Sequence, residues 1–443
     1  MTTQALRGKI GKTLAIWTPE DKAFWVREGQ ALANLNLWIS VPALFLAFAV
    51  WQMWSVIAVN LPALGYPFTP NQLFWLAAAP ALSGATLRIF YAFMVPVFGG
   101  RRWTAISTAS LLIPALGVGV AIQDPATSYA TFLMLALLCG FGGGNFSSSM
   151  ANINFFFPKE RKGSALGVNA GLGNLGVSAV QFVAPLVIAS SVFGTLGGEG
   201  QTVARAGETI TLWAQNAALI WVPFIALAAI AAWFGMNDLD TARASVREQA
   251  IIFKRKHTWI MCWLYIGTFG SFIGYSAGFP LLIRSEFPEV NALAYAWIGP
   301  LAGALIRPFG GWLSDKLGGA VVTFWNFIVM ALAVAGVLFF LGQGSFAGFF
   351  ACFMVLFLTT GIGNGSTFRM IPVIFPAKEA SPVLGFSGAI GAYGGFFIPK
   401  SYGTSIAMTG GPEAALYVFI VFYLTCIALT WWYYSRRNAP MPC

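Results

Sequence analysis

The chain has 443 residues, of which 58% are hydrophobic and only 9% are charged. Soluble domains usually carry about a quarter charged residues, so this composition excludes an ordinary water-soluble protein and indicates one surrounded largely by lipid. The formal net charge of +10 does not indicate nucleic-acid binding, because the basic residues lie in short segments between long apolar runs.

The hydropathy pattern predicts twelve membrane-spanning helices, since each apolar run is long enough to cross about 30 Å of hydrocarbon. In chain order they are expected at 36–60, 72–97, 103–122, 128–156, 163–190, 213–235, 257–281, 292–313, 321–341, 345–375, 382–407 and 414–434. No small-residue cleavage site follows the first apolar run, which favours an uncleaved polar arm over a signal peptide. The predicted fold class is therefore an all-α membrane protein.

Lysine and arginine residues predict how these spans are oriented. With the N-terminus placed inside, the inner segments hold most of the 25 basic residues, among them Arg7, Arg243, Arg247 and Lys378. The outer loops hold Arg205 and Arg284. Because basic residues favour the cytoplasmic side of a membrane, both termini are expected in the cytoplasm.

A repeated motif divides the spans into two halves. Gly84-x-x-x-Arg88 is followed after ten residues by Gly99-Gly100, and Gly303-x-x-x-Arg307 is followed after ten residues by Gly318-Gly319. The offset, 307 − 88 = 219 residues, is about half the chain. Parallel repeats of this kind face each other across a central passage in membrane transporters. We expect an arm at 1–35, a six-helix half at 36–236, a linker at 237–256, a second six-helix half at 257–434 and a tail at 435–443.

Arg88 and Arg307 lie inside predicted spans, at equivalent places in the two halves. An arginine at this depth is costly unless it faces a partner or a water-filled cavity, and it stays charged. None of the 15 acidic residues falls in the middle of a predicted span. We therefore expect both guanidinium groups to bind an anion from solution, their planar fork matching a planar oxyanion. The alternative is that each bonds main-chain carbonyls or extends to the membrane interface.

Two predicted spans are rich in glycine. GSALGVNAGLGNLG, from 163 to 176, and GFSGAIGAYGGFF, from 385 to 397, repeat glycine every fourth and every third residue. Such faces allow helices to pack closely or to slide, and an equal alternative is that they line the substrate passage. Asn169 and Asn174 favour lining for the first motif, because an amide can donate to an anion without adding charge. The candidate conformational glycines are Gly167, Gly176, Gly385, Gly391 and Gly394.

The loop GGWLSDKLGG, from 310 to 319, combines a glycine turn with Asp315 and Lys316, whereas its counterpart FGGRR at 98–102 lacks the aspartate. Such a loop can hold one half against a neighbouring helix through charge and helix-end contacts, so Asp315 is predicted to act in conformational change. Arg369 and Lys400 lie near the ends of predicted spans and are expected to extend to the membrane interface.

Enzyme chemistry finds no support in this sequence. The five cysteines form no CxxC pair, and the single histidine, His257, lies at the inner end of a span. Neither a metal centre nor a nucleophile with its base can be assembled from these residues. A sensor would need an attached signalling domain, for which the tails are too short. We therefore expect a transporter that has no cofactor and no metal.

GGWLSDKLGG resembles the signature loop of the major facilitator superfamily, and the two glycine-rich motifs resemble the nitrate signatures of the nitrate/nitrite porter family. NLWISVPALFLAFAVW, FMVPVFGGRRWTA and TFGSFIGYSAGF are similar to segments of its bacterial NarK-type members, so the resemblance covers nearly the whole chain. It implies the major facilitator fold with two pseudo-symmetric six-helix halves, a place in the bacterial inner membrane, a monomer, and nitrate and nitrite as the partners.

The resemblance also implies a substrate site. Arg88 and Arg307 match the arginines that hold the anion in the family. The other matches are Asn174 and Tyr265, which contact it, and Phe146 in GGGNF and Phe269 in YIGTF, whose rings sandwich it. Some relatives carry serine where Gly388 stands, and Ser387 is its neighbour here. Both therefore join Asn169 and Gly171 as further candidate site residues.

Paired arginines also predict a mechanism. Without an anion the two charges repel and disfavour closure, so loaded exchange by alternating access is expected to be faster than empty return. Proton coupling needs a titratable group in the path, and no acid is expected there, so nitrate/nitrite exchange is the first interpretation. Nitrate/proton symport, which occurs in the family, and transport of another small anion remain the alternatives.

Overall fold

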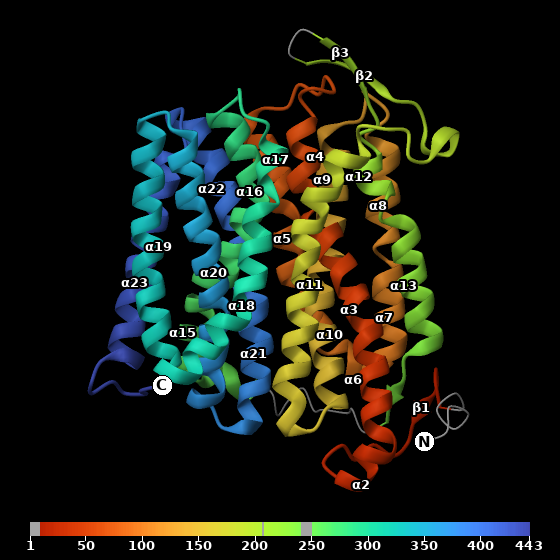
Figure 1. Cartoon of the computed structure of the whole chain (residues 1–443), viewed down its shortest axis with the longest axis vertical. Coiled ribbons are helices and arrows are strands. Elements are labelled where there is room, and N and C mark those ends of the chain that lie inside the picture. Colours follow the sequence, from red (N-terminus) through yellow and green to blue (C-terminus); the bar gives the residue numbers. More distant parts are fainter. Residues whose placement is uncertain (1–8, 206–207, 241–249) are drawn as a thin grey trace.

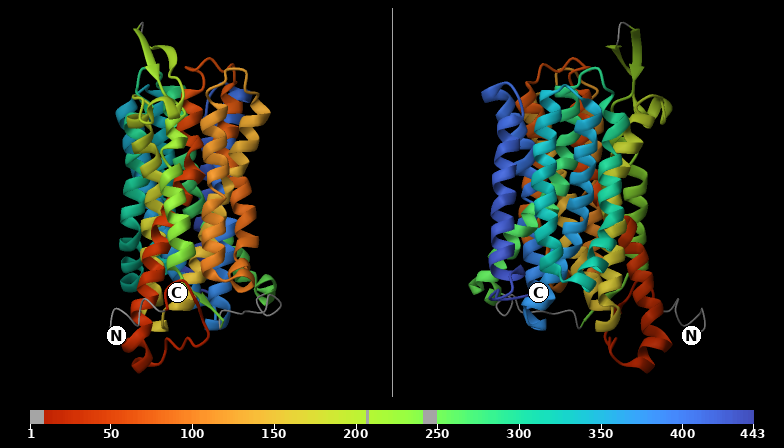
Figure 2. Two further views of the ribbon diagram at one scale, coloured as in Figure 1. Left: turned by 90° about the vertical axis from the view of Figure 1, so that its right-hand side faces the viewer. Right: turned by 60° about the vertical axis from the view of Figure 1, so that its left-hand side comes forward.

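The computed structural model describes residues 9–205, 208–240 and 250–443. Long helices run side by side along the long axis of the molecule (Figure 1). The views in Figure 2 agree that a β-hairpin projects at one end, while the C-terminus and the first described residues lie at the other. We call these the hairpin end and the linker end. Arg7, Arg243 and Arg247, which entered the predicted orientation, lie outside the described residues.

Local sequence signals set where many helices begin. The side chain of Asp21 accepts the N–H groups of Ala23 and Phe24, so the first helical stretch starts at Lys22 rather than at the predicted 36. Thr69 and Gln72 form a reciprocal capping box before α5, whose first residue is proline. Ser128 and Ser345 cap two further helices.

The first six-helix half is built from the α-helices α3 to α13, several of which join end to end. Their bounds are α3 Gln30–Gln52, α4 Trp54–Asn60, α5 Pro70–Tyr91, α6 Met94–Phe98, α7 Gly100–Ala109, α8 Leu112–Ala121, α9 Tyr129–Leu138, α10 Gly140–Phe156, α11 Lys159–Val187 and α13 Val222–Gly235, with a short α12 at Asn216–Leu219 before the last. The turn α2 Lys22–Phe24 and the π-helical segment η1 Trp25–Gly29 extend α3 toward the linker end.

The second half repeats this plan. It contains α15 Lys256–Tyr265, η4 Ile266–Gly270, α16 Ser271–Glu286, α17 Ala292–Ala296, α18 Ile298–Leu317, α19 Gly319–Gly342, α20 Phe346–Ile374, α21 Ala377–Gly391, α22 Gly394–Thr409, α23 Glu413–Thr430 and η5 Trp431–Ser435. Within the described residues, eleven helical stretches are long and apolar enough to cross a membrane. The remaining predicted span corresponds to α18, a 20-residue helix that carries Arg307, Asp315 and Lys316.

Short strands supplement the helices. β2 Gln201–Arg205 and β3 Glu208–Leu212 form an antiparallel pair in which Val203 faces Ile210. The helical prediction left this loop unassigned, although polar and apolar residues alternate over Thr209–Leu212 of β3. The amide of Gln215 donates to the carbonyls of Gly197 and Glu199 at 3.0 Å each, which fixes the base of the hairpin.

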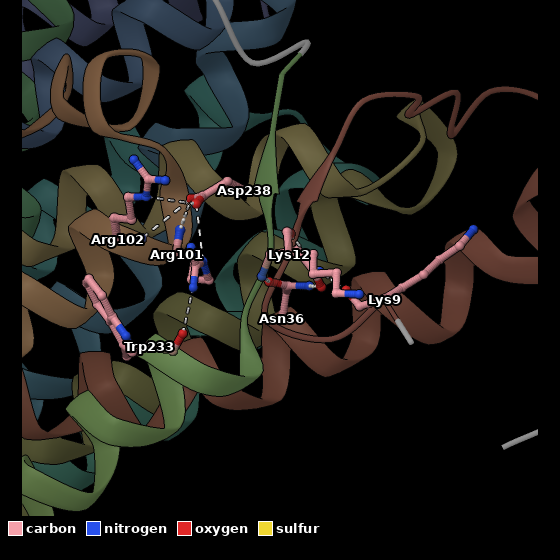
Figure 3. Close-up of polar contacts among 8 residues, drawn as sticks. Lys9, Lys12, Asn36, Arg101, Arg102, Trp233 and Asp238 are labelled. Carbon is pink, nitrogen blue, oxygen red and sulfur yellow. Dashed lines mark hydrogen bonds and ion pairs between the residues drawn. The ribbon is translucent and has the colours of Figure 1, made fainter. Parts of the chain in front are cut away.

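The beginning of the predicted linker packs firmly against the first half. β1 Thr13–Leu14 pairs with β4 Asp238–Leu239 in parallel. Figure 3 shows Asp238 directed at the start of α7, where its Oδ1 accepts the main-chain N–H of Arg101 at 2.8 Å. Its Oδ2 lies 3.2 Å from Nε of Arg101 and 3.7 Å from Nε of Arg102. Asp238 thus supplies the carboxylate that the FGGRR loop itself lacks.

The repeat in sequence is also a repeat in backbone geometry. Gly99 and Gly318 have φ values of 87° and 89°, in the region that favours glycine, and each precedes a helix. In each half, an N–H group at the start of the helix after this glycine donates to an oxygen. That oxygen belongs to the segment that follows the last helix of the same half. Arg101 N–H bonds Asp238 Oδ1 at 2.8 Å, and Ala320 N–H bonds the Cys443 carbonyl at 3.0 Å. The two halves therefore close their linker ends in the same way.

The halves contact each other closely toward the hairpin end, where α5 packs on α22, α4 on α16 and α11 on α18. A Cβ atom added to Gly403 of α22 would lie 2.7 Å from the Phe74 side chain and 2.9 Å from Asn71 Oδ1, both of α5. Toward the linker end the opposite holds. A Cβ atom added to Gly163, Gly167 or Gly171 would meet nothing within 4 Å.

Candidate functional site

Arg88 lies near the middle of the molecule, on α5, with no exposed surface. Its Nε donates to the Gly143 carbonyl and its Nη1 to the Gly388 carbonyl, each at 2.8 Å, while Nη2 is buried without a partner among the described residues. The sequence had left open whether this arginine bonds main-chain carbonyls, and it does. The carbonyls leave one guanidinium nitrogen, Nη2, without an acceptor and add no negative charge.

Aromatic rings enclose this guanidinium. Its Cζ lies 4.9 Å from the ring centroid of Trp51, 4.6 Å from that of Phe146 and 4.9 Å from that of Phe269. Phe146 comes from α10 of the first half and Phe269 from η4 of the second, and their rings stack with centroids 6.1 Å apart at 26°. Cation–π attraction stabilises the positive charge here in place of a carboxylate.

Arg307 presents a second guanidinium from α18 of the other half. It is half-buried, its Nη1 is buried without a partner among the described residues, and its Cζ lies 5.5 Å from the centroid of Phe368. A row of contacting rings, Phe269, Tyr265 and Phe368, runs from Arg88 to Arg307. The structure thus brings the paired arginines to one place, as the sequence predicted.

The ring of Tyr265 lies between the rings that contact the two arginines. The ring stacks on Phe269 at 5.3 Å and on Phe368 at 4.6 Å, and the fully buried hydroxyl has no hydrogen-bond partner among the described residues. The segment that follows, Ile266–Gly270, is π-helical. Single π turns of this kind occur often at functional sites because they change the direction of the side chains that follow.

The asparagines of the first glycine motif differ in their surroundings. Asn174 is buried, and both its amide nitrogen and its amide oxygen lack partners in the described part of the chain. Asn169 instead donates from Nδ2 to Ser149 Oγ at 2.8 Å, which ties α11 to α10. Asn174 therefore retains free hydrogen-bonding capacity, whereas Asn169 already serves the packing of its own half.

The second glycine motif contributes main chain rather than a side chain. Gly388 offers its carbonyl to Arg88, and a Cβ atom there would lie 3.9 Å from the Phe146 ring. Ser387 points elsewhere, because its Oγ accepts from Cys262 Sγ of α15 at 3.7 Å. Of the two neighbours predicted for the site, Gly388 lies against the arginine and Ser387 does not.

The glycines predicted to act in conformational change, taken together with Gly171 of the candidate site, fall into two groups. Gly167, Gly171 and Gly385 border open space, so their faces do not pack against a helix. Gly176 and Gly394 do: a Cβ atom would lie 2.1 Å from the Phe45 carbonyl oxygen of α3 and 2.5 Å from Gly270 Cα, respectively. A Cβ atom added to Gly391 would lie 2.6 Å from the Tyr265 ring. The motifs therefore combine close packing with an open face.

Arg369, Asp315 and Lys400, which the sequence analysis singled out, have side-chain partners in the structure. The Nε of Arg369 forms an ion pair with Asp315, both side chains being about half exposed. The ammonium of Lys400 lies 4.9 Å from the Trp75 centroid and donates to Thr404 Oγ1. Each partner lies on the same helix or a neighbouring one, and extension to the membrane interface stays a prediction for both residues.

Trp51 and Phe368 lie against Arg88 and Arg307, yet the sequence did not indicate either. The chain has 17 tryptophans and 40 phenylalanines, so residue type alone carries no signal. For Phe368 a signal exists in its neighbour, because it directly precedes Arg369, a basic residue within a predicted span. Within the described ranges no group of three His, Cys, Asp or Glu residues could hold a metal ion.

Comparisons with known proteins agree with this geometry. The sequence profile of the Major Facilitator Superfamily matches residues 43–399. The nitrate/nitrite transporter NarU of Salmonella typhimurium is 52% identical, over 96% of this chain and 96% of its own. The probable nitrate/nitrite antiporter NarK2 of Thermus thermophilus is 43% identical, over 99% and 100%. A bacterial homolog of the human lysosomal transporter Spinster, solved in an inward-facing and occupied conformation, superposes with a TM-score of 0.67 at 15% identity, over 90% and 96%.

Proposed function

This chain belongs to the Major Facilitator Superfamily and to its NarK-type branch, and on that premise we propose that it exchanges nitrate and nitrite across the inner membrane of a bacterium. The linker end then faces the cytoplasm. The observation that carries this proposal is the pair Arg88 and Arg307, both with a buried N–H group that has no partner among the described residues.

The two arginines suit a small planar oxyanion. Arg88 keeps Nη2 and Arg307 keeps Nη1 without a partner among the described residues, so the two guanidinium groups can each donate to an oxygen of one planar ion, an arrangement that a spherical ion does not offer. Tyr265 and Asn174 add donors without adding charge, since the hydroxyl and the amide are both unpaired. Two positive charges and two neutral donors match a monovalent anion better than a cation or an uncharged solute.

Binding between the rings also couples the anion to the conformation of the halves. The centroids of Phe146 and Phe269 lie 6.1 Å apart, whereas a flat ion between two rings needs about 7 Å, twice a van der Waals contact of about 3.5 Å. Insertion of the anion must therefore separate a ring of the first half from a ring of the second. Release lets them approach again, so occupancy and the separation of the halves change together.

Exchange follows from the electrostatics. Like charges a few ångströms apart repel by roughly 4 kcal/mol at an effective dielectric constant of about 20, and a bound anion removes that repulsion. The empty carrier is then the slow one to reorient. The polar groups gathered at the site are guanidinium, phenol, amide and main-chain groups, none of which releases a proton readily near neutral pH.

Counterflow in liposomes tests this proposal. Purified protein should take up labelled nitrate rapidly into vesicles loaded with nitrite and slowly into vesicles loaded with chloride. Uptake driven by a proton gradient into vesicles without internal nitrate or nitrite would contradict exchange and favour symport. Equal inhibition of nitrate uptake by chlorate, formate and chloride would contradict selectivity for nitrate and nitrite and favour another small anion.

A further inference from the structure

Gln181 lies on α11, where it is completely buried and reaches from one half to the other. Its Nε2 donates to Ser55 Oγ of the first half at 3.0 Å and to the main-chain carbonyl of Ser276 in the second half at 2.7 Å. Its Oε1 has no partner among the described residues. A buried amide that spans the two halves is placed to respond to their separation.

The Ser276 carbonyl, which accepts from Gln181 in the second half, lacks a donor in its own helix for a reason visible in the sequence. In an α-helix the carbonyl of residue 276 bonds the N–H of residue 280, but residue 280 of α16 is proline and has no N–H. The Ser276 carbonyl would otherwise be buried without a donor, since Ser276 has no exposed surface. Gln181 supplies the missing hydrogen bond from the opposite half.

Ser55, whose Oγ accepts from Gln181 in the first half, is oriented by a second irregularity in a helix. The helical stretch breaks at Met53, where the N–H groups of Val56 and Ile57 both bond the Met53 carbonyl. The Gln52 carbonyl is thereby left to Ser55, whose Oγ donates to it at 2.6 Å. Ser55 then directs its oxygen lone pair at Gln181. A continuous line of hydrogen bonds runs from α3 and α4 through α11 to α16.

This line lies on the hairpin side of the anion site. Gln181 follows Asn174 by seven residues on α11, Ser276 follows Phe269 by seven on the η4–α16 stretch, and both helices run toward the hairpin end. Seven residues correspond to about 10 Å of helix. The hydrogen bonds therefore form a polar layer between the paired arginines and the hairpin end, at the place where α4 packs on α16.

We propose that Gln181 is a positioning residue that stabilises the conformation closed at the hairpin end, by pairing with the carbonyl that Pro280 leaves free. Opening that end separates α11 from α16 and exposes both partners to water. The closed state is thus favoured by a bond that the open state lacks. The proposal rests on transport by alternating access, but it concerns the balance of the two conformations and not the identity of the anion.

Hydrogen–deuterium exchange of the full chain in lipid nanodiscs tests this role. In Gln181→Leu the Ser276 carbonyl loses its donor, so exchange should rise in α4 and in the hairpin-end half of α16. It should fall in α21 and in the linker-end half of α11, which border open space in the closed form. A shift of roughly two- to tenfold corresponds to one buried hydrogen bond. Faster exchange at both ends alike would indicate general destabilisation and overturn the proposal.

Two further variants make the test specific. Pro280→Ala gives Ser276 a donor within its own helix, so Gln181→Leu should change exchange much less in that background than alone. Fully additive effects would contradict the pairing. Gln215→Leu is the matched control, because this buried amide also donates to main-chain carbonyls, yet only within the first half. It should loosen the hairpin without the opposite response at the linker end.

Transport by the wild-type protein separates the two proposals. If the wild type carries no nitrate while Gln181→Leu still shifts exchange in opposite directions at the two ends, the assigned anion is wrong and the positioning role stands. If the wild type exchanges nitrate and Gln181→Leu leaves the exchange pattern unchanged, the positioning role is wrong and the transport function stands.

Discussion

Arg88 donates from Nη1 to the carbonyl of Gly388 at 2.8 Å, and this bond joins the two halves at the candidate site. The carbonyl is available because the helix is interrupted directly after it. The N–H of Ala392, which would bond Gly388 in a regular helix, turns to Ile390. Movement of α21 away from α5 must break this bond, so the second glycine motif links the position of Arg88 to the closure of the halves.

Replacing either paired arginine with lysine should impair transport although the charge is kept. Lysine offers a point charge and no planar fork, so it cannot bind two oxygens of one anion or hold the Gly143 and Gly388 carbonyls together. We expect kcat/KM for nitrate to fall roughly 30- to 150-fold in Arg88→Lys and Arg307→Lys, equivalent to about 2–3 kcal/mol. Initial rates of counterflow over a range of nitrate concentrations measure this.

The control for these two variants is Arg436→Lys. Arg436 is half-buried near the linker end, where its Nε donates to the Trp432 carbonyl at 3.0 Å. It should transport nitrate like the wild type. Unchanged kcat/KM in both site variants would show that recognition of the anion does not depend on the guanidinium fork.

Tyr265→Phe should weaken nitrate binding while leaving the fold intact. The ring that stacks on Phe269 and Phe368 remains, and only a buried hydroxyl without a partner is lost. Loss of one neutral hydrogen bond to the anion corresponds to about 1 kcal/mol, or roughly a fivefold rise in Kd for nitrate. Tryptophan fluorescence titration measures the Kd, and thermal unfolding in detergent should give a Tm at or above that of the wild type.

Tyr275→Phe is expected to show the reverse pattern. The hydroxyl of Tyr275 bonds that of Tyr423 at 2.7 Å, so its removal takes one of two hydrogen bonds from the buried Tyr423 hydroxyl, which keeps the bond to Ser271 Oγ at 2.8 Å. Its Tm should fall while the Kd for nitrate stays close to the wild-type value. If the two tyrosine variants behaved alike, the hydroxyl of Tyr265 would have a structural role and no role in binding.

Asp238→Asn should destabilise the first half more than Asp315→Asn destabilises the second. The Asp238 side chain is only 7% exposed and accepts a main-chain N–H at the start of α7 as well as contacting two arginines. Loss of this charge at a helix start should cost about 1–2 kcal/mol. Asp315 and Arg369 are 49% and 56% exposed, and such pairs contribute about 0–1 kcal/mol.

Thermal unfolding of the two aspartate variants, measured side by side in the same detergent, gives the comparison. Asp238→Asn should have the clearly lower Tm. An equal decrease in both would mean that Asp238 contributes no more than an exposed ion pair, and that the start of α7 is stabilised by other contacts.

The sequence predicted the features that depend on local composition. The spans were found because hydrophobicity is a property of each run by itself, and the repeat was found because the glycines before α7 and α19 need the same unusual backbone in both halves. Arg88 and Arg307 were singled out for the same reason, since an arginine in an apolar run is conspicuous wherever the helix points.

Contacts between helices were decided by tertiary structure alone. One residue along a helix is a turn of about 100°, so a motif cannot tell whether Gly388 or Ser387 faces the arginine. Nor does composition reveal that Asp238, 137 positions from Arg101, provides the carboxylate missing from its loop. The free carbonyls of Gly388 and Ser276 arise where helices are interrupted, and which donor reaches them depends on how two halves, built from distant parts of the chain, come to lie together.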